Sequence, residues 1–256
     1  MTAMTYENGS APETAMVSGN GQPAPNQQAA PEWVASTKQR SGRMDRSASF
    51  WDRIAERYAR KPVADEAAYK RKLEITQGYL RPNMEVMELG CGTGSTAIVH
   101  APYVKHIRAI DISSKMIEIA RRKADAASVG NITFEQSTID DLDVPSESLD
   151  VVLGLSILHL LEDKDAAITK VHGMLKPGGV FITSTVCLGS SMHWFRFIAP
   201  IGRILGLIPL VRFFTKEDLE HSLERAGFEI EYSWQPGKGK AVFIVAKKIK
   251  KNGVIS

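Results

Sequence analysis

The sequence has few cysteines, little excess charge and no long uncharged apolar run. Its 256 residues include only two cysteines, which excludes a disulfide framework and a zinc site made from cysteines alone. Residues 194–214 come nearest to a membrane span, but three arginines and two prolines interrupt them, so we expect no segment to cross a bilayer. A formal net charge of +3 does not indicate nucleic acid as a partner. We therefore expect no metal site, no DNA partner and a location in the reducing cytoplasm.

Residues 1–46 differ in composition from the rest of the chain. They are rich in Ala, Gly, Pro, Gln, Asn and Ser, and almost no large apolar residue precedes Trp33. Such a segment buries too little apolar surface to offset its ordering entropy, so we predict a disordered tail. The first thirty residues also lack the apolar stretch of a secretory signal. A single domain is predicted over residues 47–250.

Within that domain, short apolar runs alternate with helical patterns, which is typical of a parallel sheet covered on both faces. Ser47 or Ser49 is expected to cap the first helix. A second helix ends at Pro82, and a strong helical pattern covers residues 113–127. Strands are predicted at residues 85–89, 107–110, 132–134, 151–155, 180–183, 228–234 and 241–246.

The C-terminal part departs from this alternation. Thr215 and Asp218 have the spacing of a capping box, and Gly227 ends the helix that they open. Two strands then come next, with a turn at residues 236–239 between them. Because a tight hairpin cannot join parallel neighbours, the last strand must run antiparallel. The sequence therefore predicts an α/β fold with a doubly wound, mostly parallel sheet of seven strands.

A glycine-rich segment carries the main chemical signal. Residues 86–95 read Val-Met-Glu-Leu-Gly-Cys-Gly-Thr-Gly-Ser, a buried strand that enters a tight turn and then a helix. Glycines let a ligand approach the backbone, and the helix N-terminus offers free N–H groups. Asp111 ends the second strand 21 residues after Gly90, where it can accept two hydrogen bonds from a ribose. Its alternative role is to cap the next helix, a need that Ser113 or Ser114 could also meet.

These residues resemble the motifs of the class I S-adenosylmethionine-dependent methyltransferases, over about residues 50–247. Residues 88–94 look like the first motif of that family nearly letter for letter, and Asp111 stands where the family holds the ribose hydroxyls. Residues 149–161 resemble the fourth strand and the helix after it, and residues 175–181 resemble the turn before the fifth strand. The resemblance implies a Rossmann-like fold, S-adenosyl-L-methionine as cofactor, and a methyltransferase similar to the small-molecule and quinone-biosynthesis branch.

The resemblance also implies a set of cofactor-binding residues. These are Glu88, Gly90, Cys91, Gly92, Thr93, Gly94, Asp111, Ile112, Met116, Thr138, Ile139 and Leu155. After the third strand, relatives usually carry an acidic residue that receives the adenine amino group, and here Thr138 and Ile139 stand in its place. A threonine hydroxyl can still accept that hydrogen bond, and Ile139 can pack on the adenine face.

Catalysis of methyl transfer depends mainly on the alignment of donor and acceptor, so a dedicated catalytic residue is not required. His159 is the best candidate for a general base, because it lies after the fourth strand at the edge of the sheet where ligands bind. Its alternative roles are to cap the loop or to touch the methionine end of the cofactor. Trp51 and Tyr58 are candidates to close over the site, where a ring face attracts a sulfonium, or else simply to pack an amphipathic helix.

Residues 188–214 form an unusually apolar and aromatic connection. We interpret them as a lid over an apolar acceptor such as a quinone precursor, a polyketide or a lipid, with His193 and Trp194 as candidate substrate contacts. Helices that fill space in the core, or an interfacial helix that touches a membrane surface, stay open as alternatives.

Three other functions compete with this interpretation. A nicotinamide oxidoreductase would want a glycine near Ser95 and a Tyr-x-x-x-Lys motif, and neither is found. An RNA methyltransferase is disfavoured by the weak charge and by residues 154–157, which read Gly-Leu-Ser-Ile instead of Asn/Asp-Pro-Pro-Tyr/Phe. A non-catalytic cofactor-binding or assembly protein stays open, because an intact loop does not prove turnover. The oligomeric state is left open as well.

Overall fold

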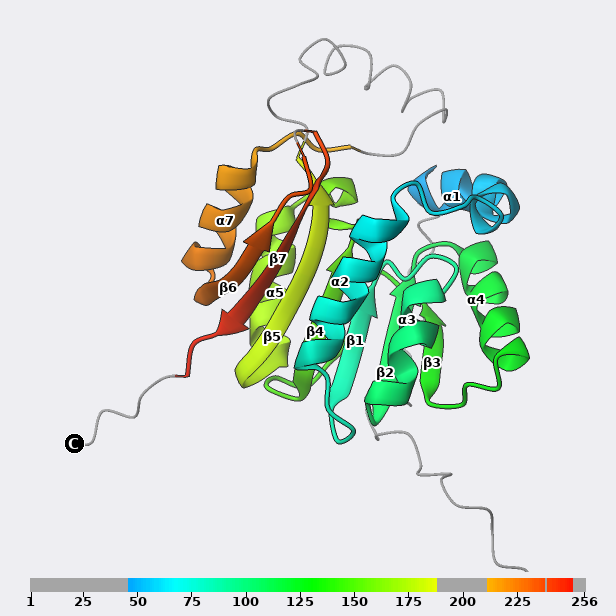
Figure 1. Ribbon diagram of the computed structural model, residues 1–256, viewed down its shortest axis with the longest axis horizontal. Coiled ribbons are helices and arrows are strands. Elements are labelled where there is room, and N and C mark those ends of the chain that lie inside the picture. Colours follow the sequence, from blue (N-terminus) through cyan, green and yellow to red (C-terminus); the bar gives the residue numbers. More distant parts are fainter. Residues whose placement is uncertain (1–45, 188–210, 238, 251–256) are drawn as a thin grey trace, which may run out of the picture. The chain divides into compact units, whose positions relative to one another are not determined.

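The computed structural model describes residues 46–187, 211–237 and 239–250 (Figure 1). The predicted tail, except for its last residue, lies outside this range. So do residues 188–210 of the predicted lid, including His193 and Trp194.

A seven-stranded sheet organises the described chain. Its strands are β1 (Glu85–Leu89), β2 (His106–Asp111), β3 (Ile132–Gln136), β4 (Leu149–Leu155), β5 (Leu175–Val186), β6 (Phe228–Trp234) and β7 (Ala241–Lys248). Their order in the sheet is β3-β2-β1-β4-β5-β7-β6. Neighbouring strands from β3 to β5 are parallel, whereas β7 is antiparallel to both β5 and β6. The predicted reversal of the last strand is thus confirmed.

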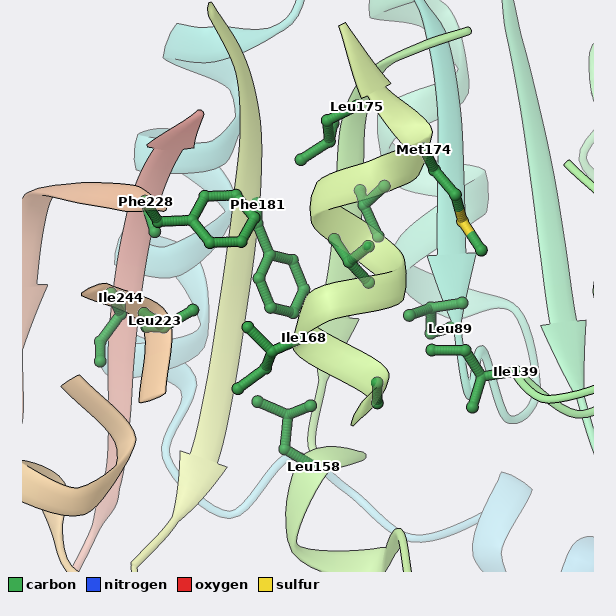
Figure 2. Packing of buried hydrophobic residues seen from close by; sticks show 14 of the residues in the cluster. Leu89, Ile139, Leu158, Ile168, Met174, Leu175, Phe181, Leu223, Phe228 and Ile244 are labelled. Carbon is green, nitrogen blue, oxygen red and sulfur yellow. The ribbon is translucent and has the colours of Figure 1, made fainter. Parts of the chain in front are cut away.

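Helices cover both faces of this sheet (Figure 1). They are α1 (Arg46–Ala59), α2 (Glu66–Tyr79), α3 (Ser95–His100), α4 (Ser114–Ala126), α5 (Lys164–Met174) and α7 (Lys216–Arg225), with short 3-10 turns at Ala101–Tyr103 (η2) and Leu158–Leu160 (η3). Side chains of β4 alternate between two cores, since Val152 packs with α5 and α7 while Val151 packs with α3 and α4. Figure 2 shows the first of these cores, in which Phe181 and Ile168 are fully buried.

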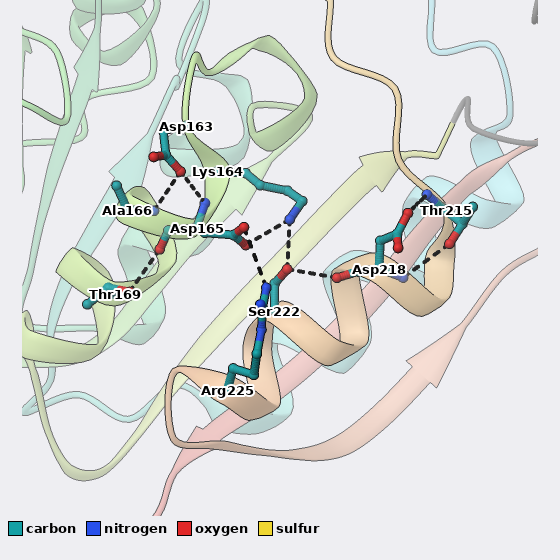
Figure 3. Close-up of polar contacts among 9 residues, drawn as sticks. All are labelled: Asp163, Lys164, Asp165, Ala166, Thr169, Thr215, Asp218, Ser222 and Arg225. Atoms are coloured by element: carbon teal, nitrogen blue, oxygen red, sulfur yellow. Dashed lines mark hydrogen bonds and ion pairs between the residues drawn. The ribbon is translucent and has the colours of Figure 1, made fainter.

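Polar contacts join the two helices that cover one end of the sheet (Figure 3). Thr215 and Asp218 form the predicted capping box at the start of α7. The Asp163 carboxylate caps α5 by accepting hydrogen bonds from two backbone N–H groups. Lys164 Nζ then donates to Ser222 Oγ across the gap at 2.7 Å, which holds α5 against α7.

Two local expectations were wrong. Neither Ser47 nor Ser49 is the N-cap of the first helix, because both lie inside α1, which already includes Arg46. The segment expected as a turn before the fifth strand belongs to β5, which begins at Leu175. Its ladder to β4 shifts register there, and Gly178 adopts φ +83°, so the start of this strand is irregular.

Candidate cofactor site

The glycine loop between β1 and α3 has one closed side and one open side. Gly90, Gly92 and Gly94 adopt φ values of +67°, +53° and +74°, which favour glycine. A Cβ atom on Gly94 would lie 2.8 Å from the Cβ of Ala120, so this glycine is needed for packing against α4. A Cβ atom on Gly92 would meet only Tyr58, at 3.9 Å. The backbone at Gly92 is therefore the part of the loop that a ligand can approach closely.

Asp111 links the end of β2 to this loop. One carboxylate oxygen accepts the N–H of Gly92 at 2.9 Å, and the other accepts the N–H of Ser113 at 2.9 Å. Burial raises the pKa of this carboxyl above its ordinary value, although hydrogen bonds from the N–H groups of Ser113, Gly92 and Ile112 act to lower it. A carboxylate has about four acceptor positions, so at least one remains free to receive a ribose hydroxyl. The neighbouring Ile112 is half-buried, and its carbonyl accepts a hydrogen bond from Gln136.

Helix α1 packs on the first turn of α4, beside Asp111. Asp52 Oδ1 accepts hydrogen bonds from Ser113 Oγ at 2.6 Å and from the N–H of Lys115 at 3.0 Å. This carboxylate was not predicted as part of the site. Because Ser113 also donates its N–H to Asp111, a chain of hydrogen bonds runs from α1 through Asp111 to the glycine loop.

The two aromatic residues of α1 have different surroundings. Trp51 packs with the buried cluster that includes Met116, so this candidate lid residue lies between α4 and α1 and does not line the cleft beside the glycine loop. Tyr58 lies next to Gly92, and its ring stands edge-on to that of Trp51 at a centroid distance of 6.1 Å. Tyr58 is therefore the aromatic residue of α1 that borders the open side of the loop.

The cleft beside the loop has a volume of about 550 Å³ and lies between α2, α3 and the carboxyl ends of β1, β4 and β5. Seven residues predicted to contact cofactor or substrate line it: Tyr58, Glu88, Gly90, Cys91, Gly92, Thr93 and Leu155. Several other lining residues were not predicted, namely Lys72, Thr76, His100, Lys123, Ser156 and Ser184.

Glu88 is a buried carboxyl in the cleft wall. It is only 2% exposed, and its Oε2 atom has no hydrogen-bond partner among the described residues. Burial, with a further effect from the charge of Asp111, raises the pKa of Glu88 from its ordinary 4.5 to about 8. A buried acceptor without a partner is costly, so this position suits a ligand that brings a hydrogen-bond donor or a positive charge.

Two lysines of the cleft wall bond to hydroxyl groups. Lys72, on α2, donates to Ser184 Oγ at the end of β5, over 2.8 Å. Lys123, on α4, donates to Thr93 Oγ1 and to Ser95 Oγ, each at 3.0 Å. Burial lowers the pKa of both ammonium groups. A lysine in an amphipathic helix usually indicates a solvent-facing side, which is why the sequence pattern could not reveal these two positions.

The predicted adenine contacts lie apart from the cleft, after β3. Thr138 Oγ1 bonds to the carboxylate of Asp141 at 2.7 Å and accepts the Asp141 N–H at 3.2 Å, so its hydroxyl helps to form a turn. Ile139 is 7% exposed and packs in the core that contains Leu89. Contact of either residue with an adenine stays a prediction.

His159 lies in the short 3-10 turn after β4. Its Nδ1 atom is buried without a hydrogen-bond partner among the described residues, and burial lowers the pKa of the imidazole below its ordinary 6.5. The ring is therefore neutral at pH 7 and able to accept a proton, but it does not line the cleft. Its role as a base stays a prediction.

The residues around the loop fit the cofactor that the sequence motifs imply. Gly92 leaves room for a ligand at the backbone, Asp111 keeps an acceptor position for a ribose, and the unpartnered Glu88 carboxyl can receive an ammonium group. S-adenosylmethionine carries both a ribose and an α-ammonium group.

Comparison with known proteins also indicates a methyltransferase. Residues 80–227, more than half of the chain, match the family model described as a methyltransferase domain. Helices α1 and α2 precede the matched residues.

Two curated relatives and one solved structure illustrate the similarity. The chain is 31% identical over 110 residues to the uncharacterized methyltransferase YcgJ of Bacillus subtilis, an alignment covering 43% of this chain and 44% of that protein. It is 28% identical over 156 residues to the demethylmenaquinone methyltransferase of Symbiobacterium thermophilum, covering 58% and 61% of the two chains. The crystal structure of YcgJ superposes with a TM-score of 0.59 at 18% identity, over 71% of this chain and 99% of that one. Both alignments span less than two thirds of the curated relative's length.

Proposed function

The chain belongs to the class I S-adenosylmethionine-dependent methyltransferases, and from this we propose that it transfers the methyl group of that cofactor to a small, largely apolar acceptor. The observation that carries the proposal is the geometry of the glycine loop. The backbone at Gly92 is open to a ligand, and its N–H donates a hydrogen bond to the Asp111 carboxylate. A ligand can therefore approach the backbone closely at a point next to a carboxylate that can bind its ribose.

Specific residues would hold the cofactor. Asp111 would receive the ribose hydroxyls, the backbone at Gly92 would border the sugar, and Glu88 would receive the α-ammonium group. When bound, S-adenosylmethionine supplies an electrophilic methyl group on a sulfonium. The chain's own contribution is to fix the direction of approach and to exclude water, effects that can supply several kcal/mol of the barrier reduction.

The proposed acceptor is quinol-like or otherwise apolar. The name of the Symbiobacterium relative points to a quinone precursor as its own acceptor, and we extend a quinol-like or other apolar acceptor to this chain. The apolar composition of residues 188–214 supports this extension, with His193 and Trp194 as candidate contacts. His159 is proposed as the base if the acceptor is a phenol or enol, because its imidazole is neutral at pH 7.

Membrane contact and transfer to RNA have no separate support. No helix of the part of the chain that the structure describes is long and apolar enough to span a membrane. Peripheral contact through residues 188–214 stays a secondary proposal, based on their apolar and aromatic composition alone.

The test is calorimetric titration of the full chain with S-adenosylmethionine, S-adenosylhomocysteine and NADH. We expect micromolar binding of both adenosyl compounds and none of NADH. Asp111→Ala should abolish that binding, because this carboxylate holds the glycine loop at Gly92. Asp165→Ala, at the start of α5, should leave it unchanged, because its carboxylate pairs with Lys164 and Arg225. Absence of adenosyl binding, or binding indifferent to Asp111, would overturn the assignment.

A second experiment distinguishes an active enzyme from a protein that binds the cofactor but does not turn it over. Formation of S-adenosylhomocysteine from S-adenosylmethionine is measured with a panel of quinols, phenols and lipids. Turnover with one of these classes identifies the acceptor chemistry. Tight cofactor binding with no turnover on any of them would favour the non-catalytic alternative.

A further inference from the structure

Lys72 brings an ammonium group into the cleft without an ion-pair partner. It lies in α2, is half-buried and lines the cleft wall. The structure gives it a hydrogen bond to Ser184 Oγ. Its acidic neighbour in the cleft wall is Asp65, whose charge acts to raise the Lys72 pKa, but the ion pair of Asp65 among the described residues is with Lys240. An ammonium has three donors, so two remain after the bond to Ser184. A partly buried cation with free donors is a position that an anionic oxygen would stabilise.

The neighbouring residue in the helix fixes this geometry. Arg71 donates to the hydroxyl of Tyr232 at 3.1 Å, and its guanidinium lies 4.5 Å from the ring centroid of Trp234. Both aromatic residues belong to β6. These contacts attach the middle of α2 to the sheet, so that Lys72 is held over the end of β5.

Glu88 lies on the same face of the sheet as Ser184. Its neighbours in β1, Met87 and Leu89, both pack in the core beneath α5 and α7, so the Glu88 side chain points to the opposite face, which α2 covers. Ser184 reaches that face too, because it bonds to Lys72 of α2. Since β4 separates β1 from β5, the two strands lie about 10 Å apart. Among the described residues, the cleft thus contains the Glu88 Oε2 atom without a hydrogen-bond partner at the end of β1, and the Lys72 ammonium of α2 without an ion pair near the end of β5.

An α-amino acid group carries the two charges that these positions lack. We propose that Lys72, supported by Ser184, binds the α-carboxylate of the cofactor's amino acid end, while Glu88 receives the α-ammonium group of the same end. This inference rests on the proposed function. It assigns to α2, which lies outside the residues that match the family model, a direct part in cofactor recognition.

The cleft wall contains three other lysines, Lys61, Lys123 and Lys240. Lys123 provides the matched control, because it is half-buried like Lys72, whereas Lys61 and Lys240 are exposed. Lys123 bonds to two hydroxyl groups, Thr93 Oγ1 and Ser95 Oγ, and is therefore better satisfied than Lys72. It also lies on the far side of the glycine loop from β4 and β5, because α4 packs next to β2 and β3. Both lysines are helix residues whose burial lowers the pKa, so replacement of either removes a comparable ammonium.

The experiment compares two ligands that differ in the amino acid end. S-adenosylhomocysteine carries the α-carboxylate and α-ammonium groups, whereas 5′-methylthioadenosine keeps the adenosyl part and lacks both. Each is titrated by calorimetry into the full chain and into Lys72→Met, Lys72→Arg and Lys123→Met. Binding of 5′-methylthioadenosine also reports that a variant is folded.

We expect Lys72→Met to weaken the binding of S-adenosylhomocysteine about ten- to a hundredfold, which is the effect of losing one hydrogen bond to a charged group. The affinity for 5′-methylthioadenosine should not change. Lys72→Arg should retain most of the affinity, because it keeps a cationic donor. Lys123→Met should change the preference between the two ligands by less than about threefold.

Three results would overturn the inference. In the first, Lys72→Met weakens the binding of both ligands equally, and in the second it weakens the binding of neither. In the third, the preference for S-adenosylhomocysteine over 5′-methylthioadenosine is lost in Lys123→Met instead. Failure of the parent chain to bind S-adenosylhomocysteine would be a different result. It would reject the proposed function itself, and the inference with it.

Discussion

Replacement of the buried Glu88 by glutamine should make the protein more stable, and more so as the pH rises. The folded chain holds this carboxyl at a pKa of about 8, against an ordinary value of 4.5. Between these two values the folded state keeps a proton that the unfolded state releases. The free energy of unfolding therefore falls as the pH rises from about 4.5 to about 8, and levels off above that. Glutamine has the same shape and no proton to lose.

The size of the effect is set by the difference between the two pKa values. One pKa unit corresponds to about 1.4 kcal/mol, so the Glu88→Gln variant should gain about 3 kcal/mol relative to the parent chain at pH 7. Near pH 9 the gain should reach about 4–5 kcal/mol, and near pH 4.5 it should almost vanish. Burial is the larger cause of the shift, and the charge of Asp111 the smaller one.

The measurement is urea unfolding of both proteins at several values between pH 5 and pH 9, in the absence of ligand. Glu74→Gln provides the control, because this α2 carboxylate is 62% exposed and forms only a surface ion pair with Lys70. Its stability difference from the parent chain should stay nearly constant across the range. Parallel pH profiles for Glu88→Gln and the parent chain would refute the reasoning, since they would mean that Glu88 is ionised in the folded state at neutral pH.

Three further changes have expected outcomes. Asp52→Ala should lower the free energy of unfolding by about 1 kcal/mol or more in urea, because its carboxylate accepts hydrogen bonds from the N–H of Lys115 and from the hydroxyl of Ser113, the residue that caps α4. Glu56→Ala on the same helix should have little effect. Gly94→Ala should lower the free energy of unfolding by about 2 kcal/mol or more, and with it the melting temperature, because residue 94 has a φ of +74° and an added Cβ would collide with α4. Gly130→Ala should have little effect, because the space around Gly130 is open. Lys248→Met should cost about 2–3 kcal/mol in the same unfolding assay, because it leaves two backbone carbonyls without their donor, and an unchanged midpoint would contradict this account.

Features that depend on neighbouring residues could be predicted from the sequence. The limits of β1 at Glu85 and Leu89 agree with the structure, because a short apolar run ending in glycines defines a buried strand locally. Reversal of the last strand was deduced from a short hairpin, and the Thr215 capping box from a three-residue spacing.

Contacts between distant parts of the chain could not be predicted. Lys72 and Ser184 are separated by 112 residues, and no local pattern distinguishes a lysine that faces a cleft from one that faces solvent. The same holds for Asp52, whose position in an amphipathic helix does not indicate that it accepts a hydrogen bond from Ser113, 61 residues later. These contacts exist only because the fold brings α1 and α2 against the sheet and α4.

The position of α1 and the geometry of the cofactor acid are coupled through Ser113. Its hydroxyl donates to Asp52 on α1, and its N–H donates to Asp111, which in turn holds the N–H of Gly92. If α1 moved away from α4, Ser113 would lose its acceptor and Asp111 would lose the nearby charge of Asp52, which acts to raise its pKa. Tyr58 would leave the open side of the loop in the same movement, because it belongs to the same helix. Access to the loop and the electrostatics of the ribose acid therefore change together, through a helix that precedes the matched methyltransferase domain.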